Sequence, residues 1–135
     1  MSLNDSIGVS ASGLRAQSMR MRIVAENLAN ADSVATRPGG EPYRRKIPVF
    51  VPRIDPAGGA TQIKVDSVAA DRAPFPRVYD PGNPAAAADG YVLKPNVNTL
   101  IEGADMKAAQ RSYQANLNAI EAARSMTMRT LDLLK

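Results

Sequence analysis

The sequence predicts a mainly α-helical chain in which long N- and C-terminal helices form a coiled-coil-like pair around a small, irregular β region. All ten prolines lie between Pro38 and Pro95, so both flanks are free to form long helices. Six of the nine glycines fall in the same window, whose composition is typical of loop-rich sequence. We therefore expect an N-terminal helix within residues 1–33, a Pro/Gly-rich middle with a β-hairpin over 34–95, and a C-terminal helix within 96–135, with the two helical segments forming one assembly domain.

The N-terminal flank carries a heptad pattern. Large apolar residues recur every seven positions and small residues follow four positions later, which is the alternation of a coiled-coil seam that a partner helix can approach closely. The large column is Ile7, Leu14, Met21 and Leu28, and the small column is Ala11, Ser18 and Ala25. Gly8 and Gly13 each weaken a helix by about 1 kcal/mol relative to Ala, so this helix is expected to need partners. Polar residues at 30–33 are expected to end it.

The C-terminal flank begins with Thr99-Leu100-Ile101-Glu102, which matches a capping box, and continues to Lys135 without proline. One seam consists of Met106, Tyr113, Ile120, Thr127 and Leu134, interleaved with Gln110, Leu117, Arg124 and Leu131. A second apolar strip consists of Ala108, Ala115, Ala119, Ala122 and Met126. A helix that is apolar on more than one side predicts more than one neighbour. Arg124 lies on an otherwise apolar seam, where we expect it to set the register or meet a carboxylate such as Glu26.

The middle contains two short β-like stretches, residues 47–51 and 62–66, separated by turn signals at 56–59 and followed by more at 79–84. Proline within a stretch favours edge strands. Because few large apolar residues are available, we expect a small β-hairpin or three-strand patch with long loops instead of a sandwich.

The composition excludes most catalytic chemistry. With no Cys and no His in 135 residues, the chain cannot form a disulfide framework, a thiolate nucleophile, an imidazole base or a Cys/His zinc site. It also lacks a Gly-rich phosphate loop, a nucleophile elbow and a carboxylate pair with metal-site spacing. We therefore expect no catalytic residue, no cofactor and no metal. With four Tyr, two Phe and no Trp, the core is expected to be thin.

The sequence gives no sign of a membrane span or a secretory signal. No apolar run approaches the roughly 18 residues that a spanning helix needs, so we expect no direct membrane insertion. Asp5 precedes any basic region, and Arg15, Arg20 and Arg22 interrupt the stretch that would have to be apolar. We expect a protein that stays in the cytoplasm or leaves by a route that cleaves nothing.

The basic run Arg44-Arg45-Lys46 has two interpretations. It could be a nucleic-acid patch, but three charges are a short run and only Tyr43 lies nearby as an aromatic platform. We prefer a strand start, either one whose charges are solvated or one whose charges protect a sheet edge from pairing with other chains.

Five motifs occur in order along nearly the whole chain. They lie at residues 28–33, 42–46, 79–84, 90–97 and 111–116. Together they resemble the proximal-rod members of the flagellar rod and hook family of axial proteins. The residues that carry this resemblance most clearly are Asn30, Tyr43, Pro81, Gly82, Asn83, Pro84, Pro95, Asn96, Tyr113, Gln114 and Asn116. Gly103-Ala104-Asp105 departs from the family pattern and is expected to disturb the first turns of the C-terminal helix.

The resemblance implies a non-enzymatic subunit of the basal-body rod, the shaft that carries torque from the motor toward the hook. It implies export without a cleaved signal through the flagellar type III export apparatus into the periplasmic rod. Implied partners are further copies of the chain and the rod proteins FlgB, FlgF, FlgG and FliE. We expect the assembly interface to consist of seam residues identified from the spacing along the two helices, namely Ile7, Ala11, Leu14, Ser18, Met21, Ala25, Leu28, Met106, Tyr113, Leu117, Ile120, Arg124, Leu131 and Leu134.

Three alternatives stay open on the residues alone, and one of them is an enzyme that uses only Asp, Glu, Ser or Lys. The N-terminal apolar column could pack on the C-terminal helix in a soluble helical hairpin. A formal charge of +4 allows a small basic nucleic-acid-binding module, although Lys and Arg are dispersed along the chain and no nucleic acid is expected as a partner.

Overall fold

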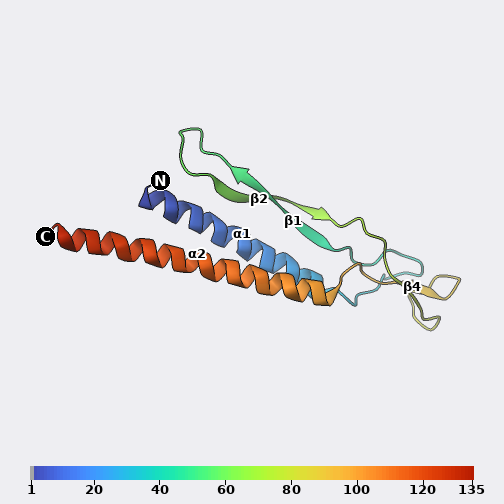
Figure 1. Cartoon of the computed structure of the whole chain (residues 1–135). Coiled ribbons are helices and arrows are strands. Elements are labelled where there is room, and N and C mark those ends of the chain that lie inside the picture. Colours follow the sequence, from blue (N-terminus) through green and yellow to red (C-terminus); the bar gives the residue numbers. More distant parts are fainter. Residues whose placement is uncertain (1) are drawn as a thin grey trace. The chain divides into compact units, whose positions relative to one another are not determined.

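The computed structural model describes residues 2–135 and has two long helices flanking four strands within that range (Figure 1). The elements in chain order are α1 (Leu3–Ala29), β1 (Lys46–Arg53), β2 (Gln62–Ala70), β3 (Arg77–Tyr79), β4 (Tyr91–Leu93) and α2 (Thr99–Leu133). The predicted arrangement of two long terminal helices around a small β region is confirmed. All ten prolines lie outside the helices, as the positions of the breakers predicted.

The chain divides into two compact units, and each unit draws on both helices and on the region between them. The first unit joins the N-terminal segment up to Met21 with Pro48–Ser67 and Lys107–Lys135. The second unit joins Arg22–Ile47 with Val68–Met106.

Helix α1 begins with a reciprocal cap. The Ser2 hydroxyl accepts a hydrogen bond from the backbone N–H of Asp5 at 3.1 Å, and the Asp5 carboxylate accepts one from the backbone N–H of Ser2 at 2.8 Å. These hydrogen bonds hold the pKa of Asp5 below its usual value. The helix ends at Ala29, immediately before the polar segment predicted to end it, and the Asn30 side chain donates to the Glu26 carbonyl at 2.9 Å.

Helix α2 begins at the predicted residue, but the predicted capping box is wrong. The side-chain oxygen of Asn98 caps the helix by accepting from the backbone N–H of Leu100 at 3.0 Å. Glu102 turns inward and is fully buried, so it does not reach back to the helix start. Gly103 does not disturb the first turns, because the helix is continuous to Leu133.

The four strands form two separate two-stranded sheets, β1 with β2 and β3 with β4. In the second, antiparallel sheet Arg77 faces Leu93 and Tyr79 faces Tyr91. Strands β1 and β2 correspond to the predicted hairpin, but the second sheet was not predicted, and Tyr79 ends a strand although it was assigned to a turn. Three-residue strands are too short to show a periodicity in the sequence. Strands β1 and β2 both extend beyond the predicted stretches.

The core is thin, as the scarcity of aromatic residues predicted. Among the described residues, the buried apolar side chains are Ala16, Ile23, Val24, Ala85, Val92, Ala109 and Ala123. Polar side chains are buried beside them, namely Ser10, Ser12, Asn27 and Glu102. Most of the buried apolar side chains are small and therefore contribute little stabilisation by burial. Hydrogen bonds between buried polar groups are thus important for fixing how the segments pack.

In the first unit, α1 passes close to α2 at Gly13. A Cβ atom at this position would lie 2.6 Å from the side-chain oxygen of Asn116. The Asn116 amide donates to the Ser112 carbonyl of its own helix at 2.8 Å, which holds the side chain in place. The absence of a side chain at Gly13 is therefore a packing requirement.

Gly13→Ala should lower the free energy of unfolding of the first unit by about 1–3 kcal/mol, because the added methyl group overpacks the site. Gly8→Ala is the matched control, since its Cβ would meet only the flexible end of Gln62 at 3.2 Å. That control should stabilise α1 by up to about 1 kcal/mol through helix propensity. Urea unfolding of both variants measures the difference, and a stabilised Gly13→Ala protein would contradict the close approach.

Candidate functional site

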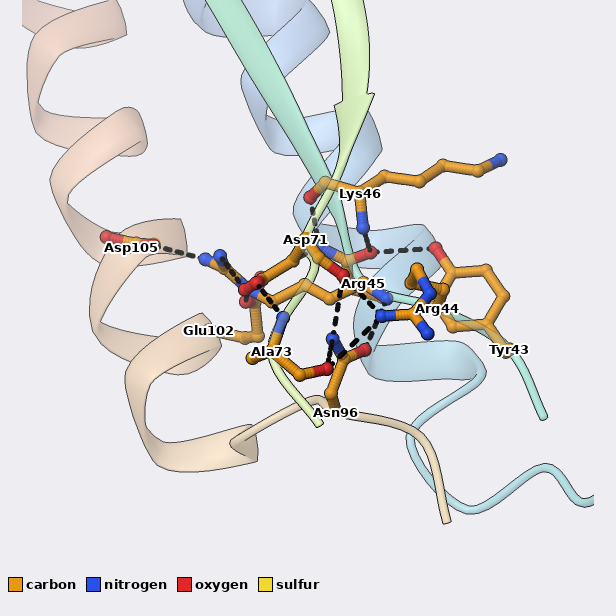
Figure 2. A network of polar contacts seen from close by, with 10 residues as sticks. Tyr43, Arg44, Arg45, Lys46, Asp71, Ala73, Asn96, Glu102 and Asp105 are labelled. Carbon is orange, nitrogen blue, oxygen red and sulfur yellow. Dashed lines mark hydrogen bonds and ion pairs between the residues drawn. The ribbon is translucent and has the colours of Figure 1, made fainter. Parts of the chain in front are cut away.

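The second unit contains a network of polar side chains, here called the polar junction (Figure 2). It joins the end of α1, the segment that leads into β1, the segment that follows β2, the loop before α2 and the first turns of α2. Its members are Asn27, Tyr43, Arg44, Arg45, Lys46, Asp71, Asn96, Glu102 and Asp105.

Asn27 on α1 uses the full hydrogen-bonding capacity of its amide. Its nitrogen donates to the Lys46 carbonyl at 2.9 Å and to the Glu102 carboxylate at 3.2 Å. Its oxygen accepts from the Tyr43 hydroxyl at 2.7 Å and from the backbone N–H of Lys46 at 2.9 Å. Asn27 is only 1% exposed. An amide supplies two donors and two acceptors at once, so an aspartate here would lose both donors.

Glu102 and Arg45 form the charged centre of the junction. The Arg45 guanidinium donates to the buried Glu102 carboxylate and also faces Asp71 at 3.3 Å and Asp105 at 3.6 Å. Burial lowers the pKa of Arg45, but the hydrogen bonds and charges of Glu102 and Asp71 outweigh burial and raise that pKa overall. Arg45 is therefore a permanent cation that neutralises a carboxylate removed from water.

Arg44 and Asn96 tie the segment after β2 to the junction. Arg44 donates to the carbonyl of Asp71 at 2.8 Å, and its guanidinium lies 4.1 Å from the ring centroid of Phe75. Asn96 accepts from the backbone N–H of Arg45 at 2.7 Å and donates to the Asp71 carbonyl at 3.0 Å. Two side chains thus hold the same carbonyl, which fixes the path of this segment (Figure 2).

The basic run does stand at the start of a strand, because β1 begins at Lys46, but the prediction that the run is solvated is wrong for Arg44 and Arg45. Arg44 and Arg45 are bonded within the junction, and Lys46 pairs with Glu26. The side chain of Arg45 is only 20% exposed. Glu26 was expected to be a possible partner of Arg124, but it pairs with Lys46 instead. Arg124 is exposed. These internal contacts do not support the other interpretation of the run, a nucleic-acid patch.

Sequence reasoning missed the roles of Asn27, Asp71 and Glu102. Glu102 had a competing local explanation in the capping box, and 57 residues separate it from Arg45. Asn27 gave one weak signal, because asparagine is a poor helix former and lies inside an otherwise helical stretch.

Burial raises the pKa of Tyr43 to about 12, and the charges of Glu26 and Glu102 act in the same direction. The folded chain therefore holds this phenolic proton more tightly than the unfolded chain, whose tyrosine pKa is about 10. The stability due to this proton is complete below about pH 10 and is lost as the pH rises through about 12.

In Tyr43→Phe, the fall in stability between about pH 10 and about pH 12 should be smaller, because phenylalanine has no proton to lose. The variant should be less stable at lower pH, since the hydrogen bond to Asn27 is missing. Urea unfolding of both proteins from about pH 9 upward tests this expectation. Parallel curves for the two proteins across the window would contradict it.

The residues that carry the family resemblance have local structural roles. Asn83 accepts from the backbone N–H of Ala85 at 3.0 Å and shapes the turn that contains Pro81, Gly82 and Pro84. Gln114 donates to Asn118 at 2.8 Å on the exposed side of α2. Pro95 is buried just before the loop to α2, and Tyr113 is half-buried.

The residues predicted to form an assembly interface differ in exposure along the helices. The large column of α1 is half-buried, whereas Ser18 and Ala25 of the small column are exposed. On α2, Met106, Tyr113, Leu117 and Ile120 are half-buried. Beyond Ala123 the helix has no buried residue, and Leu131 and Leu134 are 51% and 80% exposed.

The described residues, 2–135, include no group of three or more acidic side chains arranged to hold a metal ion. In that range no helix combines the length and the apolar character needed to cross a membrane.

Comparisons with known proteins agree with this architecture. Residues 7–35 match the family model described as "Flagella basal body rod protein", and residues 88–133 match "Flagellar basal body rod FlgEFG protein C-terminal". The chain is 50% identical over 127 residues to the flagellar basal-body rod protein FlgC of Agrobacterium fabrum, covering 94% of this chain and 91% of the relative.

Two relatives with lower sequence identity also match this chain over nearly its full length. The chain is 45% identical to FlgC of Salmonella typhimurium, with 98% of each protein covered. It is 40% identical to FlgC of Bacillus subtilis, with 96% of this chain and 97% of the relative covered. Identity at this level over both helices and the middle region establishes that the chain belongs to the FlgC family of flagellar basal-body rod proteins.

Proposed function

We propose that this chain polymerises through its terminal helices into the hollow proximal rod that transmits torque from the flagellar motor to the hook. As a member of a structural rod family, the chain is a subunit of the flagellar basal body and not an enzyme. The observation that carries the proposal is the similarity to FlgC proteins along 94–98% of the chain.

The distribution of exposed apolar residues supports assembly through the helices. At 100° per residue, the exposed Ala25 lies about 180° from the buried Ala16 on α1, so it faces away from the packing of its own chain. Met126 and Leu131 on α2, and Leu134 directly after it, are each more than half exposed. A monomer that stays in solution has little reason to expose such side chains over several helical turns. Residues 1–33 and 96–135 then act as a coiled-coil-like assembly domain, and residues 34–95 form the region inserted between them.

Heterologous contacts that do not close generate open helical assemblies, as a rod requires. We assign further copies of the chain and FlgB, FlgF, FlgG and FliE as neighbours. The interface consists of the seam residues predicted from the heptads. A free subunit with a thin core and weak helix propensity would be partly ordered and would gain further order on assembly.

Export is the second part of the proposal. Helix α1 carries arginines along its length, which is unlike a secretory signal. The flagellar type III export apparatus then delivers the chain to the periplasmic rod without cleavage. The nucleic-acid-binding alternative is not supported, because the comparisons find flagellar rod proteins and the basic run is bonded internally.

A deletion of the chain's gene tests the proposal directly. Cells that lack the chain should stop flagellar assembly before the hook, and reintroduction of the full chain should restore hooks and swimming. Electron microscopy of isolated basal bodies is the measurement. Complete rods and hooks in the deletion strain would contradict the proposal.

A further inference from the structure

The first unit contains an open groove that none of the described residues, 2–135, fills. The groove has a volume of about 530 Å³, within the range of about 300–1,000 Å³ typical of binding pockets. Residues of α1, β1 and α2 contribute to its walls. Val9, Phe50, Val51 and Ile63 provide apolar surface, and Gln17 and Asn116 provide polar groups.

One polar atom at the groove is unsatisfied. The side-chain oxygen of Gln17 is buried and has no hydrogen-bond partner among the described residues. A buried acceptor without a donor is costly, and native structures contain few of them. Gln17 lines the groove, but its oxygen is closed off from solvent in the single chain, so the side chain must turn toward the groove before an occupant can reach it. An occupant whose N–H then donates to this oxygen gains more than one that offers apolar contact alone.

The last part of α2, residues 124–133 and here called the α2 tail, has the matching chemistry. Arg124, Met128 and Leu131 fall within about 60° of one another at 100° per residue, and all three are exposed. This face therefore presents a cationic N–H donor at one end and two apolar side chains in the following turns. Spacing of this kind is typical of a helix that binds in a groove.

The α2 tail cannot enter the groove of its own chain. Asn116 on the same helix lines the groove, and Leu131 follows it by 15 residues, or roughly 22 Å at 1.5 Å per residue. The helix is continuous to Leu133, so the tail cannot fold back. The occupant must come from another molecule.

We infer that the α2 tail of one copy lies in this groove of a second copy, with Arg124 donating to the Gln17 oxygen and with Met128 and Leu131 against the apolar wall. The inference rests on the proposed assembly through the helices and specifies one contact within it. A tail-to-groove contact joins two different surfaces, so it leaves a free tail and a free groove at the ends of any chain of copies. It also gives Arg124 a role in setting the register between copies.

Cysteine cross-linking can test the contact, because the chain has no cysteine of its own. Cells that lack the native chain would produce two versions together, one with Thr61→Cys in the groove and one with Leu131→Cys in the tail. Mild oxidation of isolated basal bodies should give a disulfide-linked dimer. The matched control replaces Leu131→Cys by Asn118→Cys, which is exposed on another face of α2 and should give little dimer.

A pair of arginine variants tests the hydrogen bond within the same cross-linking assay. Arg124→Met removes the donor but keeps the length and helix propensity, and it should reduce the dimer yield about tenfold. Arg129→Met makes the same chemical change about 140° away and should leave the yield unchanged. In a Gln17→Leu background the effect of Arg124→Met should disappear.

The outcomes separate this contact from the proposed function. If basal bodies form and contain the chain but Leu131→Cys gives no more dimer than Asn118→Cys, the contact is wrong and the rod function stands. Equal effects of Arg124→Met and Arg129→Met would overturn the role of the Gln17 oxygen. Complete rods in cells that lack the chain would instead overturn the proposed function.

Discussion

Glu102→Gln should lower the free energy of unfolding of the second unit by about 3 kcal/mol. The substitution keeps the shape of the side chain but removes the negative charge that faces Arg45. Glu102 is fully buried, so water cannot replace this charge. Loss of one partner of a buried ion pair typically costs about 3–5 kcal/mol, because the remaining charge stays in a poorly solvated site. We expect the lower end of this range, since Asp71 and Asp105 still face Arg45.

Asp89→Asn is the matched control for this prediction. Asp89 pairs with Arg77 at 2.7 Å, but both side chains are more than half exposed. Exposed ion pairs contribute about 0–1 kcal/mol, so this acid-to-amide change should have little effect. Urea unfolding gives both values. Similar small shifts for the two variants would show that the polar junction does not hold the second unit together.

The long helices and the loop-rich middle could be predicted because their signals are local. Proline positions decide where a helix can form, and heptad spacing shows which faces are apolar. Both signals can be recognised within a short stretch of sequence, without knowledge of contacts to distant residues. The thin core could also be predicted, since it depends on composition alone.

The polar junction could not be predicted, because it depends on contacts between segments far apart in the chain. Arg45 and Glu102 are separated by 57 residues, and Asn27 and Glu102 by 75. Asn27 gave only a weak signal, and Glu102 and Arg45 each had a plausible local role that did not require a distant partner. Glu102 fitted a capping box, and Arg45 fitted a charged strand start.

The second sheet and the N-terminal cap of α2 could not be predicted either, although both depend on residues that are close in the sequence. Strands β3 and β4 have three residues each, which is too few for an alternation to stand out. At α2, two adjacent residues were both good caps, and Asn98 occupies the position that the pattern had given to Thr99. Buried Glu102 decides between them, because its side chain is held by Arg45 and Asn27.

The largest effect on assembly is expected from a charge on the predicted seam of α2. Ile120→Asp should be exported yet fail to support rod completion and swimming, whereas Asn118→Asp should swim normally. Ile120 is half-buried, and an aspartate there loses about 1.5–3 kcal/mol of apolar burial and adds the cost of an unpaired charge. In a rod this loss recurs at every copy.

Asn118→Asp is a fair comparison because it adds the same charge on the same helix, roughly 160° away at 100° per residue. Asn118 is exposed, and the aspartate keeps the oxygen that accepts from Gln114 at 2.8 Å. The expected change in folding stability is within about 0.5 kcal/mol. Swimming assays and electron microscopy of basal bodies, at matched levels of exported protein, give the readout.

Leu131→Asp separates loss of assembly from loss of folding. Leu131 is 51% exposed in the single chain and lies beyond the last buried residue of α2, so the substitution should hardly change the unfolding of the free protein. If the seam is buried between subunits, rod completion should still fail, because the same carboxylate then sits in an apolar contact. Normal swimming of both Ile120→Asp and Leu131→Asp at matched export would refute the seam, and failure of Asn118→Asp alone would place the interface on the polar side of the helix.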